Sequence, residues 1–79
     1  MAPNLKSLKE FESNQHWLQA HYQEVLEEHK DQFVAVWRNS VIDSDSDLDA
    51  LSDRVHKRVS GAKGVYIEFV TDQPLEMIL

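Results

Sequence analysis

The sequence predicts an α+β fold, a small two-layer α-β-β-α-β domain whose three-stranded sheet carries two helices packed on one face. Three observations predict it. An apolar stripe at helical spacing precedes residue 31, runs of β-branched and aromatic residues occupy 32–38 and 65–70, and a second helical stripe lies between those runs. With 79 residues and no Cys, we expect one domain held together without a disulfide or a thiolate zinc site.

Residues 1–12 are expected to form a flexible or helical lead-in to a single α+β domain at residues 13–71. Ser13 or Asn14 offers a side-chain oxygen to cap the first helix. The lead-in is either continuous with that helix or bent at Ser13. The helix should end near Lys30, and its apolar stripe consists of Trp17, Leu18, Tyr22, Val25 and Leu26.

Residues 32–38 are rich in Val and aromatic residues, which favours a strand. Asn39-Ser40 is the expected two-residue turn, because Asn tolerates a positive φ better than most residues do. Residues 41–43 then form a short returning strand. We place the first strand in the centre of the sheet, with the third strand antiparallel to it.

The second helix should begin after Ser46 or Asp47, either of which can act as its N-cap. Gly61 is expected to adopt a left-handed conformation just after the helix ends. The third strand should span 65–70, with Val65, Ile67 and Phe69 on one side, and residues 72–79 form an apolar C-terminal tail. The apolar face of the second helix consists of Leu48, Leu51, Val55 and Val59.

The first strand is apolar on both sides, with Phe33, Ala35 and Trp37 on one and Val34 and Val36 on the other. Two helices on one face would leave the second face uncovered, and an exposed apolar face usually marks a binding surface. The tail, a second copy of the chain or another protein could cover it. The expected interaction surface is Val34, Val36, Trp37, Tyr66 and Val70 on the sheet, with Leu75, Met77, Ile78 and Leu79 in the tail.

These features predict a cytoplasmic, non-enzymatic protein-binding or accessory module that can form a homodimer. A net charge of −6 disfavours nucleic acid and anionic membranes as partners. There is no apolar run of about 20 residues and no signal-peptide core at the N-terminus. We expect no catalytic residue and no cofactor, because no nucleophile elbow, phosphate loop or HExxH motif is present.

The alternative function is a cation- or small-ligand-binding protein that uses the acidic segment 43–49. Asp43, Asp45 and Asp47 alternate as the ligands of a calcium loop do. Counting from Asp43, however, the sixth position holds Leu48 instead of Gly and the twelfth holds Arg54 instead of Glu. The three aspartates are therefore only weak metal candidates, and an acidic cap at a helix N-terminus explains them as well.

Three segments resemble a known family: His16-Trp17-Leu18, Phe33-Val34-Ala35-Val36 and Val41-Ile42-Asp43-Ser44-Asp45. Their order, with a capped helix and an aliphatic strand to follow, is similar to the small prokaryotic family described as domain of unknown function 5678. The resemblance covers about two-thirds of the chain. It implies an α+β mini-domain with no established activity, so it transfers no catalytic residue to this sequence.

Overall fold

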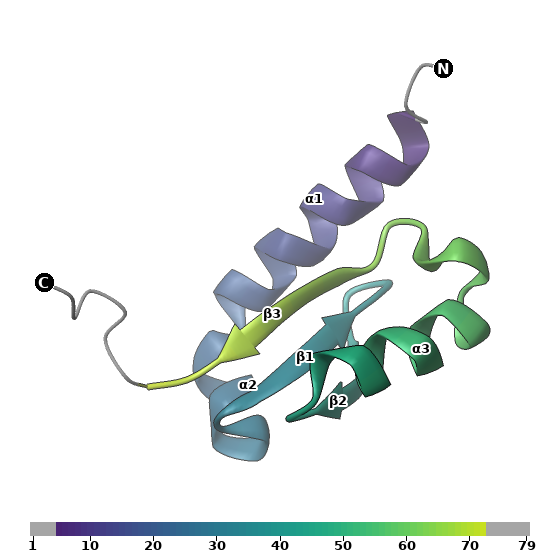
Figure 1. Cartoon of the computed structure of the whole chain (residues 1–79). Coiled ribbons are helices and arrows are strands. Elements are labelled where there is room, and N and C mark those ends of the chain that lie inside the picture. The colour runs from purple at the N-terminus through teal and green to yellow at the C-terminus, as the bar shows by residue number, and fades with distance from the viewer. Residues whose placement is uncertain (1–4, 73–79) are drawn as a thin grey trace, which may run out of the picture.

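The computed structural model describes residues 5–72, which form three α-helices and a three-stranded antiparallel sheet (Figure 1). The predicted α+β class and the predicted three-stranded sheet are confirmed. The elements, in chain order, are α1 (Leu5–Ala20), α2 (Tyr22–His29), β1 (Gln32–Val36), β2 (Val41–Asp45), α3 (Leu48–Arg58), the short 3-10 turn η1 (Ser60–Ala62) and β3 (Tyr66–Val70).

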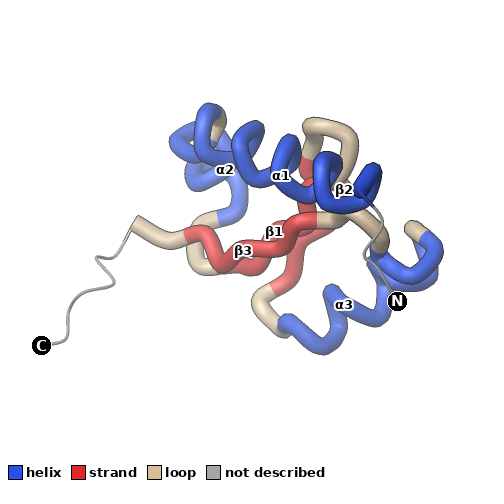
Figure 2. Tube along the Cα trace, turned by 90° about the horizontal axis from the view of Figure 1, so that it is seen from above, coloured by secondary structure: helices blue, strands red, loops and turns tan. Residues whose placement is uncertain are grey.

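The sheet lies between helices on both of its faces. The strand order is β2-β1-β3, with β1 in the centre and antiparallel to both neighbours, as predicted. Helices α1 and α2 cover one face and α3 covers the other (Figure 2). The prediction of two layers with both helices on one face is therefore wrong, and the domain has three layers.

Two hydrophobic cores, one on each face of β1, explain this arrangement. The alternation of a strand sends Val34 and Val36 to one face and Ala35 to the other, and all three are completely buried. On the α3 face, Ala35 packs with Leu51, Val55, Val59 and Val65. On the opposite face, Val34, Val36 and Val70 pack with Leu18, Val25 and Leu26. A strand that is apolar on both sides needs cover on both, and the chain provides it by placing α3 opposite α1 and α2.

Helix α1 is continuous from Leu5 to Ala20, so the boundary expected at residue 13 lies inside a helix. Ser13 and Asn14 are not helix caps, and that prediction is wrong. Asn14 is instead a buried polar bridge, with only 2% of its surface exposed. Its side-chain Nδ2 donates to the Gly64 carbonyl at 2.7 Å, and its Oδ1 accepts the Asn39 backbone N–H at 3.0 Å. Asn14 thus fixes α1 to two loops at one end of the sheet.

The turn between β1 and β2 lies one residue earlier than predicted. Trp37 and Ser40 exchange both backbone hydrogen bonds, at 2.9 and 3.2 Å. The two residues between them, Arg38 and Asn39, have φ values of 52° and 60°. Positive φ at both central positions is what a type I′ hairpin turn requires. Backbone pairing of the strands therefore decides the turn, even though Arg rarely adopts this conformation.

The predicted ends of the second helix agree well with the structure. Asp47 is the N-cap of α3, and its carboxylate accepts the backbone N–H groups of Asp49 and Ala50. Gly61 has φ 67°, as predicted, although it lies in η1, two residues beyond the C-cap Val59. Within residues 5–72, no helix is both long enough and apolar enough to cross a bilayer.

The two-core arrangement predicts that each face is needed for stability. Leu18→Ala and Leu51→Ala should each lower the free energy of unfolding by about 2–5 kcal/mol, since each removes a buried side chain and leaves a cavity. Leu48→Ala, at a side chain that is 43% exposed, is the control and should cost less than about 1 kcal/mol. Urea denaturation measures all three. A small effect at Leu51 would contradict packing of α3 on the sheet.

The Asn14 bridge gives a second prediction. Asn14→Ala leaves the Gly64 carbonyl and the Asn39 N–H without their partner, so it should lower the free energy of unfolding by about 1–3 kcal/mol. Its neighbour Ser13, which is exposed and whose hydroxyl donates to the Asn39 side chain, is the matched control. Thermal and urea unfolding of both variants test this. Equal losses for Ser13→Ala and Asn14→Ala would show that the bridge does not stabilise the fold.

Candidate functional site

The two edge strands of the sheet are the places where backbone groups face away from β1. Because Trp37 and Ser40 exchange both bonds, the backbone groups of Trp37 face β2. These groups alternate in direction along a strand, so those of Gln32, Val34 and Val36 face β3. Their partners on β3 are Val70, Glu68 and Tyr66. It follows that the N–H and C=O groups of Ile67 and Phe69 point outward from the free edge of β3.

The outer edge of β2 is closed by side chains. The Ser44 carbonyl accepts from Arg54 Nη2 at 3.1 Å, and the Ile42 carbonyl accepts from Arg58 Nη1 at 2.8 Å. The Ser44 N–H donates to Asp43 Oδ1 at 2.8 Å. A bulge also interrupts the register of β2 with β1, between the partners of Ala35 and Val36. Bulges and charged side chains are common ways to protect an edge strand from pairing with another chain.

The outer edge of β3 has no such protection in the part of the chain that the structure describes. No side chain among residues 6–72 hydrogen-bonds to the outward backbone groups of Ile67 or Phe69. Its register with β1 is regular over all five residues, without a bulge. The strand contains no Pro and no Lys, and its one charged residue is Glu68. An edge of this kind can accept another strand.

On the α3 face, apolar side chains line this edge. Phe69 is 41% exposed and meets Phe33 edge to face, with ring centroids 4.9 Å apart. Ile67 is half-buried on the same face. Helix α3 packs against β2 and β1 and leaves β3 largely uncovered, as the offset of α3 from β3 in Figure 1 shows. The side chains of an added strand would therefore meet apolar groups on this face.

On the opposite face, α1 runs along β3 (Figure 1) and exposes Leu8 and Phe11, by 45% and 40%. The Phe11 ring lies edge to face against Tyr66, with centroids 5.2 Å apart. The Tyr66 hydroxyl donates to Glu68 Oε1 at 2.5 Å. Burial and this carboxylate raise the pKa of Tyr66 to about 12, so the phenol remains a donor at neutral pH. We refer to Leu8, Phe11, Tyr66, Ile67 and Phe69 as the β3-edge surface.

The structure separates the residues of the predicted interaction surface. Val34, Val36 and Val70 are completely buried beneath α1 and α2, so their assignment to an exposed face is wrong. Tyr66 belongs to the β3-edge surface. Leu75, Met77, Ile78 and Leu79 lie outside the described residues.

Sequence reasoning missed Phe11 and Phe69 as surface residues. Phe69 alternates with Ile67 on the side of β3 that both predicted helices were expected to cover. Only the lateral offset of α3 toward β2 leaves it exposed. Phe11 was placed in a flexible or helical lead-in, without the prediction that this segment would run beside β3.

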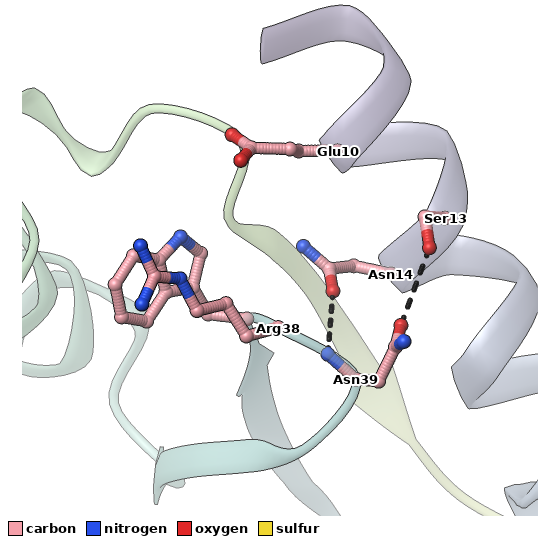
Figure 3. Close-up of a pocket in the computed structure, with 6 residues that line it drawn as sticks. Glu10, Ser13, Asn14, Arg38 and Asn39 are labelled. Atoms are coloured by element: carbon pink, nitrogen blue, oxygen red, sulfur yellow. Dashed lines mark hydrogen bonds between the residues drawn. The ribbon is translucent and has the colours of Figure 1, made fainter. Parts of the chain in front are cut away.

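Trp37, also predicted for the surface, is half-buried and packs against the core on the α3 face. It also lines an open hollow of about 270 Å³ between the hairpin turn and α1 (Figure 3). The Arg38 guanidinium lies over its ring, 4.3 Å from the centroid. Asn14 and Ser13 both bond to Asn39 across the hollow, and Glu10 lies on the α1 side. Both the Nδ2 and the Oδ1 of Asn14 are already hydrogen-bonded within the chain. The polar groups of this hollow therefore mainly hold α1 to the turn.

A second hollow of about 540 Å³ lies between α2 and β2. Trp17 and Val41 form its apolar part, and Glu24, Glu28 and His29 form its polar part. Glu28 is largely exposed, and its carboxylate is 3.8 Å from His29 Nε2. Among residues 5–72, no three His, Asp or Glu side chains are arranged to hold a metal ion.

The acidic segment 43–49 has internal partners. Arg54 Nε donates to Asp43 at 2.9 Å and Arg54 Nη1 to Asp45 at 3.0 Å. Asp45 also accepts the backbone N–H of Asp47, and Asp47 caps α3. The weak metal candidates Asp43, Asp45 and Asp47 thus hold α3 to β2. Hydrogen bonds from Arg54 lower the pKa of Asp43, whereas the pKa of Asp45 is lowered first by the N–H of Asp47 and then by Arg54.

Comparison with known proteins adds no relative: no protein-family model matches the chain, and searches of curated proteins and of solved structures return no significant match. The resemblance to domain of unknown function 5678 stays a prediction. The candidate site therefore depends on the geometry of the chain itself.

The Asp43–Arg54 contact predicts how stability depends on pH. The pKa of Asp43 is lower in the folded chain than in the unfolded chain, where it is about 3.8. The contribution of the Asp43–Arg54 contact to the free energy of unfolding is therefore fully present above the unfolded pKa, and it is lost as the pH falls through the folded pKa. From about pH 5 to about pH 2, the free energy of unfolding should fall more steeply in the wild type than in Arg54→Met. Urea denaturation across this range measures the slopes. Lys57→Met, an exposed cation on the same helix, should keep the wild-type slope; parallel curves for Arg54→Met would contradict the assignment.

Proposed function

We propose that this chain is a non-enzymatic protein-binding module that takes up an extended protein segment along the free edge of β3. The observation that carries the proposal is the difference between the two edges. Side chains from α3 and from the strand itself occupy the outward groups of β2. The outward groups of Ile67 and Phe69 have no such partners among the described residues. An added strand would supply them with backbone hydrogen bonds.

The side chains around this edge define the segment that would fit. Successive side chains of a strand point to opposite faces. Those on one face would meet Ile67 and Phe69, and those on the other would meet Phe11 and Tyr66. A segment with apolar side chains on both faces therefore suits the edge. Burial of a few hundred Å² of apolar surface contributes several kcal/mol at about 25 cal/mol per Å², from which the cost of ordering the segment is subtracted.

The proposal includes no catalytic step and no cofactor, since its evidence is a strand edge with apolar side chains beside it. It keeps the protein-binding role predicted from the sequence and moves that role from the second face of the sheet to the edge of β3. Binding would then depend on the outward backbone groups of Ile67 and Phe69 instead of on an uncovered apolar face.

Site-specific photo-crosslinking tests the proposal. A p-benzoylphenylalanine residue placed at Phe69 should crosslink to a protein partner in the native cell, because this side chain borders the binding edge. The same residue placed at Leu48 is the matched control: Leu48 is equally exposed, at 43% against 41%, but follows β2 at the opposite edge of the sheet. Introducing Phe11→Lys into the Phe69-labelled chain should reduce the crosslink at least about fivefold. Equal crosslinking from positions 69 and 48 would contradict the proposal.

A further inference from the structure

We propose that the segment bound at the β3 edge is β3 of a second copy of this chain, so that two sheets join antiparallel about a two-fold axis at Ile67. The inference rests on the proposed function, because it names the partner of the same edge. Two three-stranded sheets would become one continuous sheet of six strands.

The backbone of β3 is compatible with this pairing. Ile67 directs both its N–H and its C=O outward, so the two copies of Ile67 can exchange two hydrogen bonds across the axis. Phe69 also faces outward, and its N–H reaches the carbonyl of Val65 of the second copy. The Val65 N–H already donates to the Ala62 carbonyl at 3.3 Å, so it needs no partner across the interface. The symmetric pair thus forms four backbone hydrogen bonds.

Side-chain pairing favours this register. With Ile67 on the axis, Glu68 of each chain lies opposite Tyr66 of the other, and within one chain these two side chains already form a hydrogen bond. Moving the axis one residue toward the C-terminus places the two Glu68 carboxylates directly opposite each other, and like charges in a cross-strand pair are destabilising. Phe69 lies opposite Val65 in the favoured register, which pairs an aromatic with a β-branched side chain.

Helix α1 extends the interface beyond the two strands. Its Phe11 contacts Tyr66, which is the residue next to the axis. Phe11 and Leu8, both about two-fifths exposed, would therefore approach the α1 helix of the second copy above the joined strands. Stable interfaces bury roughly 1,200 Å² or more, and the α1 contact adds apolar area to that of the strand pair.

The closed edge of β2 limits the assembly to two chains. An interface that uses the same surface on both partners closes after one pairing. Further growth would need the other edge of the sheet, whose outward groups at Ile42 and Ser44 are bonded to Arg58, Arg54 and Asp43. The structure therefore supports a discrete dimer instead of an open-ended fibre.

Sedimentation equilibrium and NMR amide exchange of the full chain test the inference together. The mass should rise from 9.2 kDa to twice that value as concentration increases. Over the same range, the amides of Ile67 and Phe69 should become protected at least about tenfold, whereas those of Tyr66 and Glu68, which face β1, should be protected throughout. The control for a nonspecific effect is the Ser44 amide, whose bond to Asp43 does not depend on the dimer.

Two variants test the interface without altering the inward ladder of β3. Phe11→Lys and Phe69→Lys each place a charge on an exposed position of the β3-edge surface, and each should weaken dimerisation at least about tenfold. Leu48→Lys makes the same change at an equally exposed position beside β2 and should leave dimerisation unchanged. Circular dichroism confirms that each variant folds.

A chain that remains monomeric at about 1 mM would overturn the inference, because at this concentration even a dimer with a Kd of about 1 mM is substantially populated. So would a dimer in which the Ile67 amide exchanges freely, or protection of Ile67 that does not depend on concentration. If the chain is monomeric and the probe at Phe69 still crosslinks to another protein, the proposed function stands and only the identity of the partner is wrong. Equal crosslinking from positions 69 and 48 would contradict both the proposed function and the dimer.

Discussion

The burial of β1 on both faces determines where the helices of this domain can pack. Val34, Ala35 and Val36 follow one another in the chain, and none of them has any exposed surface. Successive residues of a strand point to opposite faces, so neither face of β1 can be left open to water. A chain of 79 residues meets this requirement with a thin layer of helix on each side.

The position of α3 connects this constraint to the candidate site. Arg54 and Arg58 of α3 bond to the carboxylates and carbonyls of β2, which draws the helix toward that edge. The same contacts occupy the outward groups of β2 and leave the α3 face of β3 uncovered. One set of interactions therefore closes one edge of the sheet and leaves the other available. The acidic segment acts in this scheme as a structural clamp, and its contribution to function is indirect.

Most of what could be predicted from the sequence is local. The alternation of β1 and β3 and the Asp47 cap follow from residues close together in the chain, and the central place of β1 was the one correct prediction that joins strands far apart in it. The apolar stripe of α3 does not determine on which face of the sheet the helix packs, because it would suit either side. Asn14 was misassigned because its partners, Gly64 and Asn39, are distant in sequence. Of the candidate site, only Tyr66 was predicted, since the exposure of Phe69 depends on the offset of α3.

Methyl NOE measurements test the three-layer arrangement most directly. Helices on opposite faces of the sheet should give NOEs from the Ala35 methyl to Leu51 and Val55 of α3, and from the Val34 methyls to Leu18 of α1, with none between Leu18 and Leu51. NOEs that join Leu18 to Leu51, or that join Val34 to α3, would place the helices on one face of the sheet. The closed β2 edge and the open β3 edge would then lose their structural basis.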